Sequence, residues 1–451
     1  MKRLYFGTDG VRGSAEGPIV NKAFFARLAA ATVSWLRVSG KISTDSGKPI
    51  RVLIGRDTRA SGVALEKAVA AGIRSVGAEA ISLGVLPTPA VPRAVLANGA
   101  ELGVVITASH NPASDNGIKF FGPNGQKLSD AEELAIEQHI GADVEMTASP
   151  STDSDAAIAD YISMAQRILP NGALRGWRIV LDTANGATSF TSPVVLGALG
   201  AELLALGSIP DGININADVG SEHPQLLAET VLSSGAKIGI AHDGDGDRCV
   251  LCDELGQVLD GDEIITILAL QALKHDQLVN KTLVVTVQSN LGVDKAVSAQ
   301  GGRVLRTSVG DRYVSERMAA EGATLGGESS GHIICADICS TGDGLVAALK
   351  VIEVMFETGL PLSQLRTCLQ KSPQATAALL VGEKRKLTSC PTLVLAINSL
   401  ENELGARGRV LVRYSGTEAK LRMLVEGPTN EIVDDGIVRL QVAARADLDV
   451  L

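Results

Sequence analysis

Short apolar segments that lead straight into loops of glycine and polar residues recur along this chain, and they constrain its fold more than any other feature. Longer segments with apolar residues at helical spacing separate them, so strand and helix alternate. This alternation is typical of α/β domains with partly parallel sheets, whose ligands bind beyond the carboxyl ends of strands. Three loops follow such strands, at residues 107–112, 243–247 and 326–331. We therefore expect the functional site where domains meet at these loops.

The chain is long enough for several hydrophobic cores, because 451 residues exceed what one ordinary core supports. A stretch rich in Ser, Thr, Asp and Pro at about residues 147–155 is typical of a linker. The pattern predicts three similar α/β domains with mixed sheets and a smaller C-terminal α+β domain, all around a central active-site cleft. The predicted domains span residues 1–150, 156–254, 255–370 and 373–451.

Local signals place several elements of the first domain. Residues 51–54 form an apolar run that predicts a strand. Ser61 precedes apolar residues at helical spacing and is predicted to be the N-cap of a helix that ends near Gly77. Ser129 and Glu132 have the spacing of a capping box, which predicts the start of another helix.

Composition and charge exclude several classes of protein. Hydrophobic residues make up 45% of the chain and charged residues 20%, which is typical of a folded globular protein. The net charge of −10 argues against nucleic acid as a partner. The first residues lack an apolar signal core and no segment is long enough to span a bilayer, so we expect a cytoplasmic protein without membrane contact.

The cysteines favour neither disulfides nor a zinc site. Six cysteines are few for this length, and most lie in or beside apolar runs, as reduced core thiols do. Cys249 and Cys252 form a CxxC pair, but no second pair at zinc-ribbon spacing accompanies it. We therefore expect both to be structural.

The loop Asp243-Gly244-Asp245-Gly246-Asp247 predicts a metal site. Its glycines permit a tight backbone, so the three carboxylates can turn toward one point and offer the hard oxygen ligands that suit Mg²⁺. One alternative is a calcium loop of the EF-hand type with Glu254 at the twelfth position, although Arg248 stands where that loop needs Gly. The other alternative is an acidic turn without a ligand.

Ser109 is the candidate to carry a phosphoryl group, since a metal held by three aspartates needs a further oxygen and phosphate is a common partner of Mg²⁺. It follows a strand, lies beside His110 in a turn made by Asn111 and Pro112, and precedes Lys119. The alternative is that Ser109 only shapes the turn. No G-x-S-x-G sequence surrounds a plausible nucleophile, which argues against a hydrolase elbow.

Two further loops carry groups that can bind a phosphosugar. Glu328 and Ser330 offer a carboxylate and a hydroxyl to sugar hydroxyls, although Ser-Gly clusters also form ordinary turns. In the last domain, a guanidinium, small hydroxyls and a glycine follow a strand, and a second arginine lies on the next strand; this combination suits a phosphate but also a solvated turn. The residues are Arg413, Ser415, Gly416, Thr417 and Arg422.

The four loops, in this order, resemble those of the α-D-phosphohexomutase superfamily, and the resemblance extends over essentially the whole chain. Residues 6–13 resemble the members that act on glucosamine phosphates, whereas relatives acting on glucose or mannose phosphates more often have Ser in place of Asp9. The alternative is therefore an enzyme of the same superfamily that acts on glucose or mannose phosphates. Two positions depart from the pattern: Ser329 stands where Gln is usual, and Ala419 where Pro is usual.

The resemblance implies an isomerase that moves a phosphoryl group between O6 and O1 of glucosamine and supplies UDP-N-acetylglucosamine synthesis. Ser109 would be phosphorylated in the resting enzyme, and a sugar 1,6-bisphosphate would be both the intermediate and an activator. One Mg²⁺ per chain would be bound by Ser109, Asp243, Asp245 and Asp247.

The resemblance also assigns roles to individual residues. Lys119 is the expected general acid and base, assisted by His110, and we expect neighbouring cations to lower the pKa of Lys119. Arg12 and Arg248 are further cations beside the transferring group. Glu328 and Ser330 would bind the sugar. Its phosphate would be bound by Arg413, Ser415, Gly416, Thr417 and Arg422. Asp57 and Arg59 are expected to be scaffold.

The expected partner is a small phosphosugar. A homodimer is compatible with the resemblance, and either an activating kinase or autophosphorylation would supply the phosphate on Ser109. Two other classes compete with the mutase: a phosphosugar sensor without turnover, which would need no nucleophile beside a metal, and a Mg²⁺-dependent phosphatase, which would release phosphate to water as fast as it transfers it.

Overall fold

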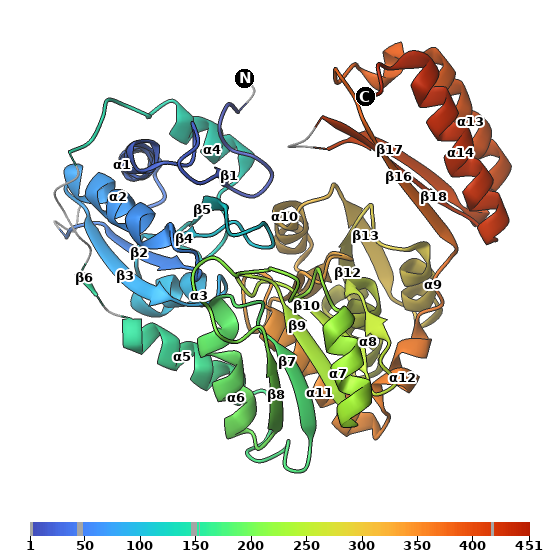
Figure 1. The fold of residues 1–451 in the computed structure, drawn as a ribbon, viewed down its shortest axis with the longest axis horizontal. Coiled ribbons are helices and arrows are strands. Elements are labelled where there is room, and N and C mark those ends of the chain that lie inside the picture. Colours follow the sequence, from blue (N-terminus) through green and yellow to red (C-terminus); the bar gives the residue numbers. More distant parts are fainter. Residues whose placement is uncertain (1–2, 43–47, 146–150, 153, 416–418) are drawn as a thin grey trace. The chain divides into compact units, whose positions relative to one another are not determined.

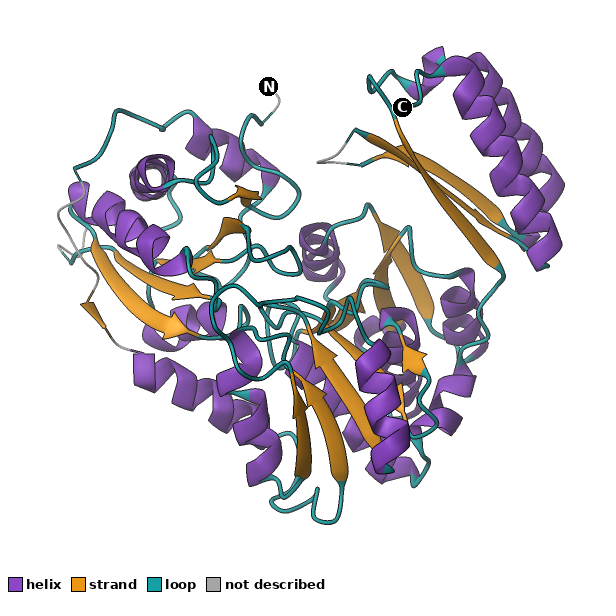
Figure 2. Cartoon of the chain, viewed as in Figure 1, coloured by secondary structure: helices purple, strands orange, loops and turns teal. Residues whose placement is uncertain are grey.

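The structure, a computed structural model, describes residues 3–42, 48–145, 151–152, 154–415 and 419–451. The chain forms two compact units. The first comprises Met1–Gln288 and Gln300–Cys368, and the second comprises Ser289–Ala299 and Leu369–Leu451. Figures 1 and 2 draw the elements of both units.

The first sheet mixes parallel and antiparallel strands (Figures 1 and 2). Its elements and those around it are β1 (Val11–Ser14), α1 (Lys22–Val38), β2 (Arg51–Arg56), α2 (Gly62–Ser75), β3 (Glu79–Val85), α3 (Ala90–Asn98), β4 (Leu102–Ile106), β5 (Asp115–Phe121), α4 (Asp130–Glu137) and β6 (Ser151–Thr152). The strand order is β1-β5-β4-β2-β3-β6, with β4, β2, β3 and β6 parallel and both β5 and β1 antiparallel to their neighbours. Apolar side chains of α1, α2, α4 and the strands β1 to β5 form one buried core.

The predicted elements of this domain are largely confirmed, with two corrections. The capping box of Ser129 and Glu132 is present at the start of α4. Ser61 does precede α2, but its hydroxyl makes no capping bond and instead accepts a hydrogen bond from Asn116 Nδ2 at 2.8 Å. The predicted linker at 147–155 is wrong in part, because β6 pairs with β3 there. Residues 146–150 and 153 lie outside the described residues.

The second sheet has the order β11-β10-β9-β7-β8 (Figure 1). The strands β9, β7 and β8 are parallel to one another. β10 and β11 are antiparallel to their neighbours. The elements are α5 (Ser154–Gln166), β7 (Arg178–Asp182), the 3₁₀ helix Ala187–Phe190, α6 (Ser192–Ala198), β8 (Glu202–Leu206), α7 (Gln225–Ser234), β9 (Ile238–His242), β10 (Cys249–Asp253) and β11 (Val258–Leu259).

The third sheet has the order β13-β12-β14-β15 (Figure 1). β13, β12 and β14 are parallel, and β15 is antiparallel to β14. The elements are α8 (Gly261–Lys274), the 3₁₀ helix Val279–Lys281, β12 (Thr282–Thr286), β13 (Arg303–Thr307), α10 (Asp311–Glu321), β14 (Leu325–Gly327), β15 (Ile333–Cys335), α11 (Gly344–Thr358), α12 (Leu362–Leu365) and the 3₁₀ helix Arg366–Cys368.

The three sheets share one arrangement that positions the predicted loops. In each sheet, one parallel strand is followed in the chain by a loop and then by its antiparallel neighbour. The pairs are β4 and β5, β9 and β10, and β14 and β15. The loops between them carry Ser109, the three aspartates and Glu328, respectively. The predicted α/β class with three similar domains and mixed sheets is therefore confirmed.

The second unit has a purely antiparallel sheet in the order β16-β18-β17, with two helices packed together on it (Figure 1). This agrees with the predicted smaller α+β domain. The elements are α9 (Leu291–Ala299), β16 (Gln374–Leu380), the 3₁₀ helix Leu387–Ser389, α13 (Pro391–Leu404), the 3₁₀ helix Gly405–Arg407, β17 (Arg409–Tyr414), β18 (Lys420–Glu426) and α14 (Asn430–Asp447).

Helix α9 belongs to this unit although it connects β12 with β13 in the sequence. The fully buried carboxylate of Glu426 accepts a hydrogen bond from the backbone N–H of Leu291 at 3.0 Å. Arg409 forms an ion pair with the same carboxylate and donates to the carbonyl oxygen of Ser289 at 2.6 Å. Lys295 Nζ donates to Ser372 Oγ at 3.0 Å. These bonds tie the start of α9 to β17 and β18.

The cysteines lie in the structure as their sequence context predicts. All six cysteines are free thiols, and five of them are buried. The CxxC pair lies on β10, where Cys249 and Cys252 are both inaccessible to solvent. Across the described part of the chain, no helix combines the length and apolarity needed to cross a bilayer.

Candidate active site

Ser109 lies in the loop after β4, in a conformation that presents its hydroxyl to the aspartate loop. Its φ of 53° is in the left-handed region, which is uncommon for a residue other than glycine. The backbone N–H of Ser109 donates to Thr107 Oγ1 at 2.9 Å, and Ser109 Oγ donates to Asp243 Oδ2 at 2.6 Å. Ser109 is fully buried. The structure thus brings together the predicted nucleophile and one predicted metal ligand.

The strained loop around Ser109 is held by a buried arginine. Arg59 is 1% exposed, and among the described residues its side chain bonds to the loop backbone and to Asp57. Its Nη2 donates to the carbonyl oxygens of Ser109 at 3.0 Å and Asn111 at 2.7 Å; its Nη1 donates to that of Asp115 at 2.9 Å and to that of Pro112. Asp57 Oδ2 also accepts from Thr107 Oγ1 at 2.7 Å. This agrees with the scaffold role expected for both residues.

The three aspartates of the metal loop converge on one point. Ligand oxygens of Asp243, Asp245 and Asp247 lie within 4.8 Å of one another, and all three residues are buried. A Cβ on Gly244 would come within 2.6 Å of the Ser109 carbonyl oxygen, so only glycine permits this approach of the two loops. Burial, with the charges of the other two aspartates, raises the pKa of Asp243 well above its usual range.

These residues fit a divalent cation. Asp245 Oδ1 and Asp247 Oδ1 are buried and accept no hydrogen bond from the described residues. Buried carboxylate oxygens without a partner are costly, and a hard cation would remove that cost. The donor set of carboxylates and a serine oxygen is the one Mg²⁺ prefers.

The calcium-loop alternative is wrong. β10 separates the aspartates from Glu254, which would have to be the twelfth-position ligand. Glu254 instead accepts hydrogen bonds from the hydroxyl and the backbone N–H of Ser363. Glu254 therefore lies at the far end of a strand and takes no part in the aspartate cluster.

Lys119 on β5 reaches the same cluster. Its Nζ lies 2.9 Å from Asp245 Oδ2, 3.2 Å from Asp247 Oδ2 and 3.0 Å from Asp9 Oδ2. Burial alone would lower the pKa of Lys119, but these three carboxylates outweigh it and raise the pKa well above its usual range. The expectation that neighbouring cations lower this pKa is wrong, because carboxylates rather than cations surround the ammonium.

His110, Arg12 and Arg248 lie around the nucleophile as predicted. His110 Nδ1 is 3.4 Å from Ser109 Oγ, and burial, together with the charges of Arg248 and Arg12, lowers the pKa of His110 to about 4. His110 is therefore neutral near pH 7. Arg12 pairs with Asp9, and Arg248 Nε lies 3.9 Å from Asp247 Oδ1.

The loop with Glu328 and Ser330 forms hydrogen bonds within its own domain and to the second domain. Glu328 Oε1 accepts from the Gly310 N–H at 2.9 Å, and the Gly331 carbonyl oxygen accepts from Cys249 N at 3.1 Å. Burial, with the nearby charge of Asp311, raises the pKa of Glu328. Ser330 Oγ is buried and has no hydrogen-bond partner among the described residues, so it is available to a ligand.

In the second unit, Arg413 on β17 lies directly opposite Arg422 on β18. Directly opposed residues of a sheet lie on the same face, so the two guanidinium groups can reach one anion. Ser415 follows β17 and is buried, and its carbonyl oxygen accepts from Lys384 Nζ at 2.8 Å. Gly416 and Thr417, the other two predicted phosphate-binding residues, lie outside the described residues.

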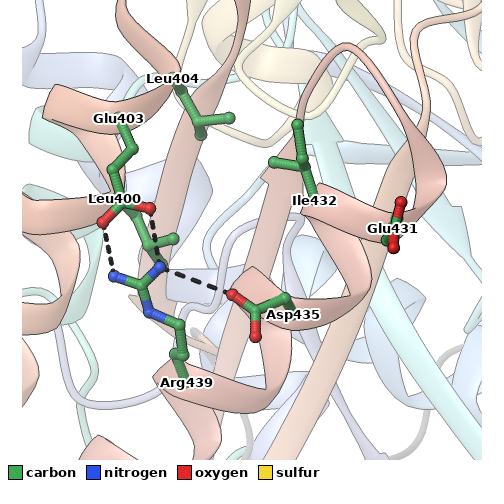
Figure 3. Close-up of a pocket in the computed structure, with 7 residues that line it drawn as sticks. All are labelled: Leu400, Glu403, Leu404, Glu431, Ile432, Asp435 and Arg439. Atoms are coloured by element: carbon green, nitrogen blue, oxygen red, sulfur yellow. Dashed lines mark hydrogen bonds and ion pairs between the residues drawn. The ribbon is translucent and has the colours of Figure 1, made fainter.

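A pocket of about 350 Å³ on the second unit lies between α13 and α14 (Figure 3). Arg439 bonds to both carboxylate oxygens of Glu403, at 2.8 and 2.7 Å, and lies 3.5 Å from Asp435. The polar groups drawn in Figure 3 therefore largely satisfy one another. None of the predicted site residues lines this pocket.

The structure adds residues that the sequence alone did not indicate. Thr88 Oγ1 donates to Asp245 Oδ2 at 2.6 Å, and Asn216 Nδ2 donates to the Ser109 carbonyl oxygen at 2.9 Å. His332 lies with Nδ1 3.6 Å from Asp247 Oδ1 and Nε2 3.4 Å from Asp311 Oδ2. Thr88 follows the carboxyl end of β3, so the strand-end rule could have selected it. The other contacts had no signal in the local sequence.

Family models match along most of the chain. The model described as phosphoglucomutase/phosphomannomutase, alpha/beta/alpha domain I, matches residues 3–146. The models for domain II, domain III and the C-terminal domain of the same family match residues 159–256, 260–372 and 363–440.

Curated relatives are similar over nearly the full length. The chain is 44% identical to the phosphoglucosamine mutase of Pelobacter propionicus over 450 residues, which covers 96% of this chain and 98% of the relative. It is 43% identical to that of Geobacillus thermodenitrificans, with 99% of both chains covered. It is 42% identical to that of Streptococcus pneumoniae, again with 99% of both covered.

Solved structures show the same fold at lower identity. A phosphoglucomutase/phosphomannomutase family protein from Burkholderia thailandensis superposes with a TM-score of 0.81 at 22% identity and covers 100% of this chain and 99% of its own. The N-acetylphosphoglucosamine mutase of Aspergillus fumigatus, solved with GlcNAc-6P and magnesium, gives a TM-score of 0.64 at 18% identity, with 99% and 96% covered.

Proposed function

Because this chain belongs to the phosphoglucomutase/phosphomannomutase family and is therefore a phosphohexomutase, an isomerase, we propose that it interconverts glucosamine 6-phosphate and glucosamine 1-phosphate. The relatives that match over nearly the whole chain, at 42–44% identity, carry the name phosphoglucosamine mutase, which supports the choice of sugar. In the cell, the product would supply the synthesis of UDP-N-acetylglucosamine.

The observation that carries the proposal is the bond of 2.6 Å from Ser109 Oγ to Asp243 Oδ2. It joins a hydroxyl that can bear a phosphoryl group to a buried carboxylate cluster that fits Mg²⁺. A phosphosugar sensor needs no such nucleophile, so the contact favours an enzyme. Bound by Ser109 and the three aspartates, Mg²⁺ would neutralise charge on the transferring phosphoryl group.

The resting enzyme would carry a phosphoryl group on Ser109. As the sugar O1 attacks phosphorus, the bond from phosphorus to Ser109 Oγ breaks, and the proton of the O1 hydroxyl passes to a base of the chain. His110 is neutral and 3.4 Å from Ser109 Oγ, whereas Lys119 holds its proton among carboxylates. We nevertheless propose Lys119 as the general acid and base, assisted by His110, because Mg²⁺ bound by Asp245 and Asp247 would neutralise the carboxylates that hold the proton on Lys119.

The resulting 1,6-bisphosphate would reverse its orientation in the site. It would then return the phosphoryl group of O6 to Ser109, which leaves glucosamine 1-phosphate. Glu328 and Ser330 would bind the ring hydroxyls in both orientations. Arg413, Ser415, Gly416, Thr417 and Arg422 would bind the phosphate that is not being transferred. Arg12 and Arg248 would stabilise the charge of the transferring group.

A coupled assay tests the proposal with purified protein, Mg²⁺ and catalytic glucose 1,6-bisphosphate. Glucosamine 6-phosphate is compared with glucose and mannose phosphates, for the wild type and for Ser109→Ala. We expect the fastest turnover with glucosamine phosphate and loss of activity in the variant. Faster turnover of glucose or mannose phosphate would reject the sugar but keep the reaction, and an active variant would reject the nucleophile.

Two side measurements complete the test. Release of inorganic phosphate at the rate of transfer would indicate a phosphatase instead of a mutase. Incubation of dephosphorylated protein with ATP and Mg²⁺, followed by mass spectrometry of the Ser109 peptide, distinguishes autophosphorylation from dependence on a kinase. Light scattering of the same sample tests the homodimer.

A further inference from the structure

Lys127 lies buried between two carboxylates that come from different domains. Its Nζ is 2.6 Å from Asp9 Oδ1 and also forms an ion pair with Asp311 Oδ2. The Lys127 side chain is 6% exposed, and the Asp311 side chain is 9% exposed. Asp9 precedes β1 in the first domain, whereas Asp311 is the first residue of α10 in the third. One ammonium therefore joins the two domains at a point almost closed to water.

Asp9 connects this bridge to the catalytic cations. Its Oδ2 lies 3.0 Å from Lys119 Nζ and forms an ion pair with Arg12, while its Oδ1 faces Lys127. A single carboxylate thus holds three cations in fixed directions. Without Lys127, Asp9 Oδ1 would lose this partner, and the carboxylate that orients Lys119 and Arg12 would be less constrained.

Asp311 connects the bridge to the sugar-binding loop. Its Oδ2 is 3.4 Å from His332 Nε2, at the end of that loop. The residue before it, Gly310, donates its N–H to Glu328 Oε1 at 2.9 Å. Asp247, Asp311 and His332 also form a group that could hold a metal, but Lys127 already supplies the positive charge beside Asp311. The ammonium of Lys127 therefore lies in this second acidic cluster, where a metal ion could otherwise bind.

We propose that Lys127 is a positioning residue that fixes Lys119 and Arg12 relative to the sugar-binding loop through its two carboxylates, Asp9 and Asp311. The inference rests on the proposed phosphohexomutase reaction and adds to it a residue that touches neither Ser109 nor the aspartates of the metal loop in the described structure. Its contribution is the alignment of groups from two domains, an effect that can change rates strongly when reacting atoms move by about 1 Å.

The test must separate alignment from simple charge balance, because Lys127→Met leaves a buried negative charge and lowers stability. The double variant Lys127→Met/Asp311→Asn removes one positive and one negative charge together. Lys350→Met is the matched control, since Lys350 pairs only with Glu353 in the described structure and lies on α11 away from the site. For each protein, kcat, KM and the melting temperature are measured on whichever hexose phosphate the wild type converts fastest.

We expect Lys127→Met to lower kcat by about 10- to 100-fold while KM changes by less than about threefold. The double variant should recover most of the melting temperature but keep the low kcat, and Lys350→Met should match the wild type. The inference is overturned if Lys127→Met keeps wild-type kcat, or if the double variant regains kcat together with stability. Substrate preference of the wild type tests the proposed function separately, because every variant is compared on one substrate.

Discussion

Arg59 donates a hydrogen bond to the carbonyl oxygen of Ser109 over 3.0 Å, although the two residues are 50 positions apart in the sequence. The same guanidinium bonds three other carbonyl oxygens of the loop. Carbonyl oxygens that point toward one cation would otherwise repel each other, so Arg59 stabilises a backbone conformation that the loop would not adopt alone.

Replacing Arg59 by Lys should therefore impair catalysis more than charge conservation suggests. An ammonium cannot reach four carbonyl oxygens in the geometry of a planar guanidinium. Since charge-assisted hydrogen bonds contribute roughly 1.5–3 kcal/mol each, we expect the free energy of unfolding to fall by about 2–4 kcal/mol and kcat by about tenfold or more. Urea denaturation and the coupled assay measure both. Arg303→Lys is the control, since Arg303 is about half exposed and pairs with Glu321; an Arg59→Lys enzyme with wild-type kcat would contradict the anchoring role.

Thr88→Val should weaken binding of Mg²⁺ without altering the fold. Thr88 Oγ1 fixes Asp245 Oδ2 at 2.6 Å, which leaves Asp245 Oδ1 available to the cation. Loss of a partner that orients a metal ligand typically costs about 10- to 100-fold in affinity. After removal of metal with EDTA, titration of activity with Mg²⁺ should show this increase in the half-saturating concentration. An unchanged titration curve would show that Asp245 needs no such support.

Glu137→Ala should release the N-terminal segment that leads to Asp9 and Arg12. The carboxylate of Glu137 accepts backbone N–H groups of Leu4 at 2.8 Å, Tyr5 at 2.7 Å and Phe6 at 3.0 Å. Their loss should cost about 1–3 kcal/mol and expose this segment to proteases. Limited proteolysis with mass spectrometry should show new cleavage near Phe6, less in Glu137→Gln, which keeps one acceptor oxygen. Equal cleavage in all three proteins would contradict the prediction.

Asp343 should make stability depend on pH in the acid range. Burial raises the pKa of Asp343 from 3.8 to about 6. Hydrogen bonds from the N–H of Val346 and the hydroxyl of Tyr161 oppose this rise but do not cancel it. The folded chain therefore binds this proton more tightly than the unfolded chain between about pH 4 and pH 6, and stability falls as pH rises through that window.

Asp343→Asn removes this titration and keeps an oxygen that can cap α11 at the Val346 N–H. Its free energy of unfolding relative to the wild type should rise by up to about 3 kcal/mol between pH 4 and pH 8. Urea denaturation at a series of pH values measures the difference. A constant difference between the two proteins across that range would exclude Asp343 as the titrating group.

The parts of the site that could be predicted from sequence are those whose residues are neighbours along the chain. The aspartates of 243–247 and the turn at Ser109 are contiguous, so their chemistry was visible in the order of residues and in the resemblance of the loops. The confirmed strands were predicted for the same reason, since alternation and apolar runs are local signals.

The remaining contacts depend on residues far apart in the sequence. Thr88 and Asp245 are 157 positions apart, and Lys127 and Asp311 are 184 positions apart. The pKa of Lys119 was predicted in the wrong direction because its neighbours Asp9 and Asp245 come from other segments. Helix α9 follows β12 as a crossover helix would, and nothing in its own sequence indicates that Glu426 binds its first turn.

The membership of α9 in the C-terminal unit also sets an order of events during synthesis. The ribosome releases α9 well before β18, so its partner Glu426 does not yet exist when β12 and β13 can already pair. The bond between α9 and Glu426 therefore forms only when translation is nearly complete. A nascent chain paused after residue 368 would thus hold α9 without Glu426, Arg409 and Ser372, the residues that bond to this segment in the folded chain, and chaperones would have their best opportunity at that stage.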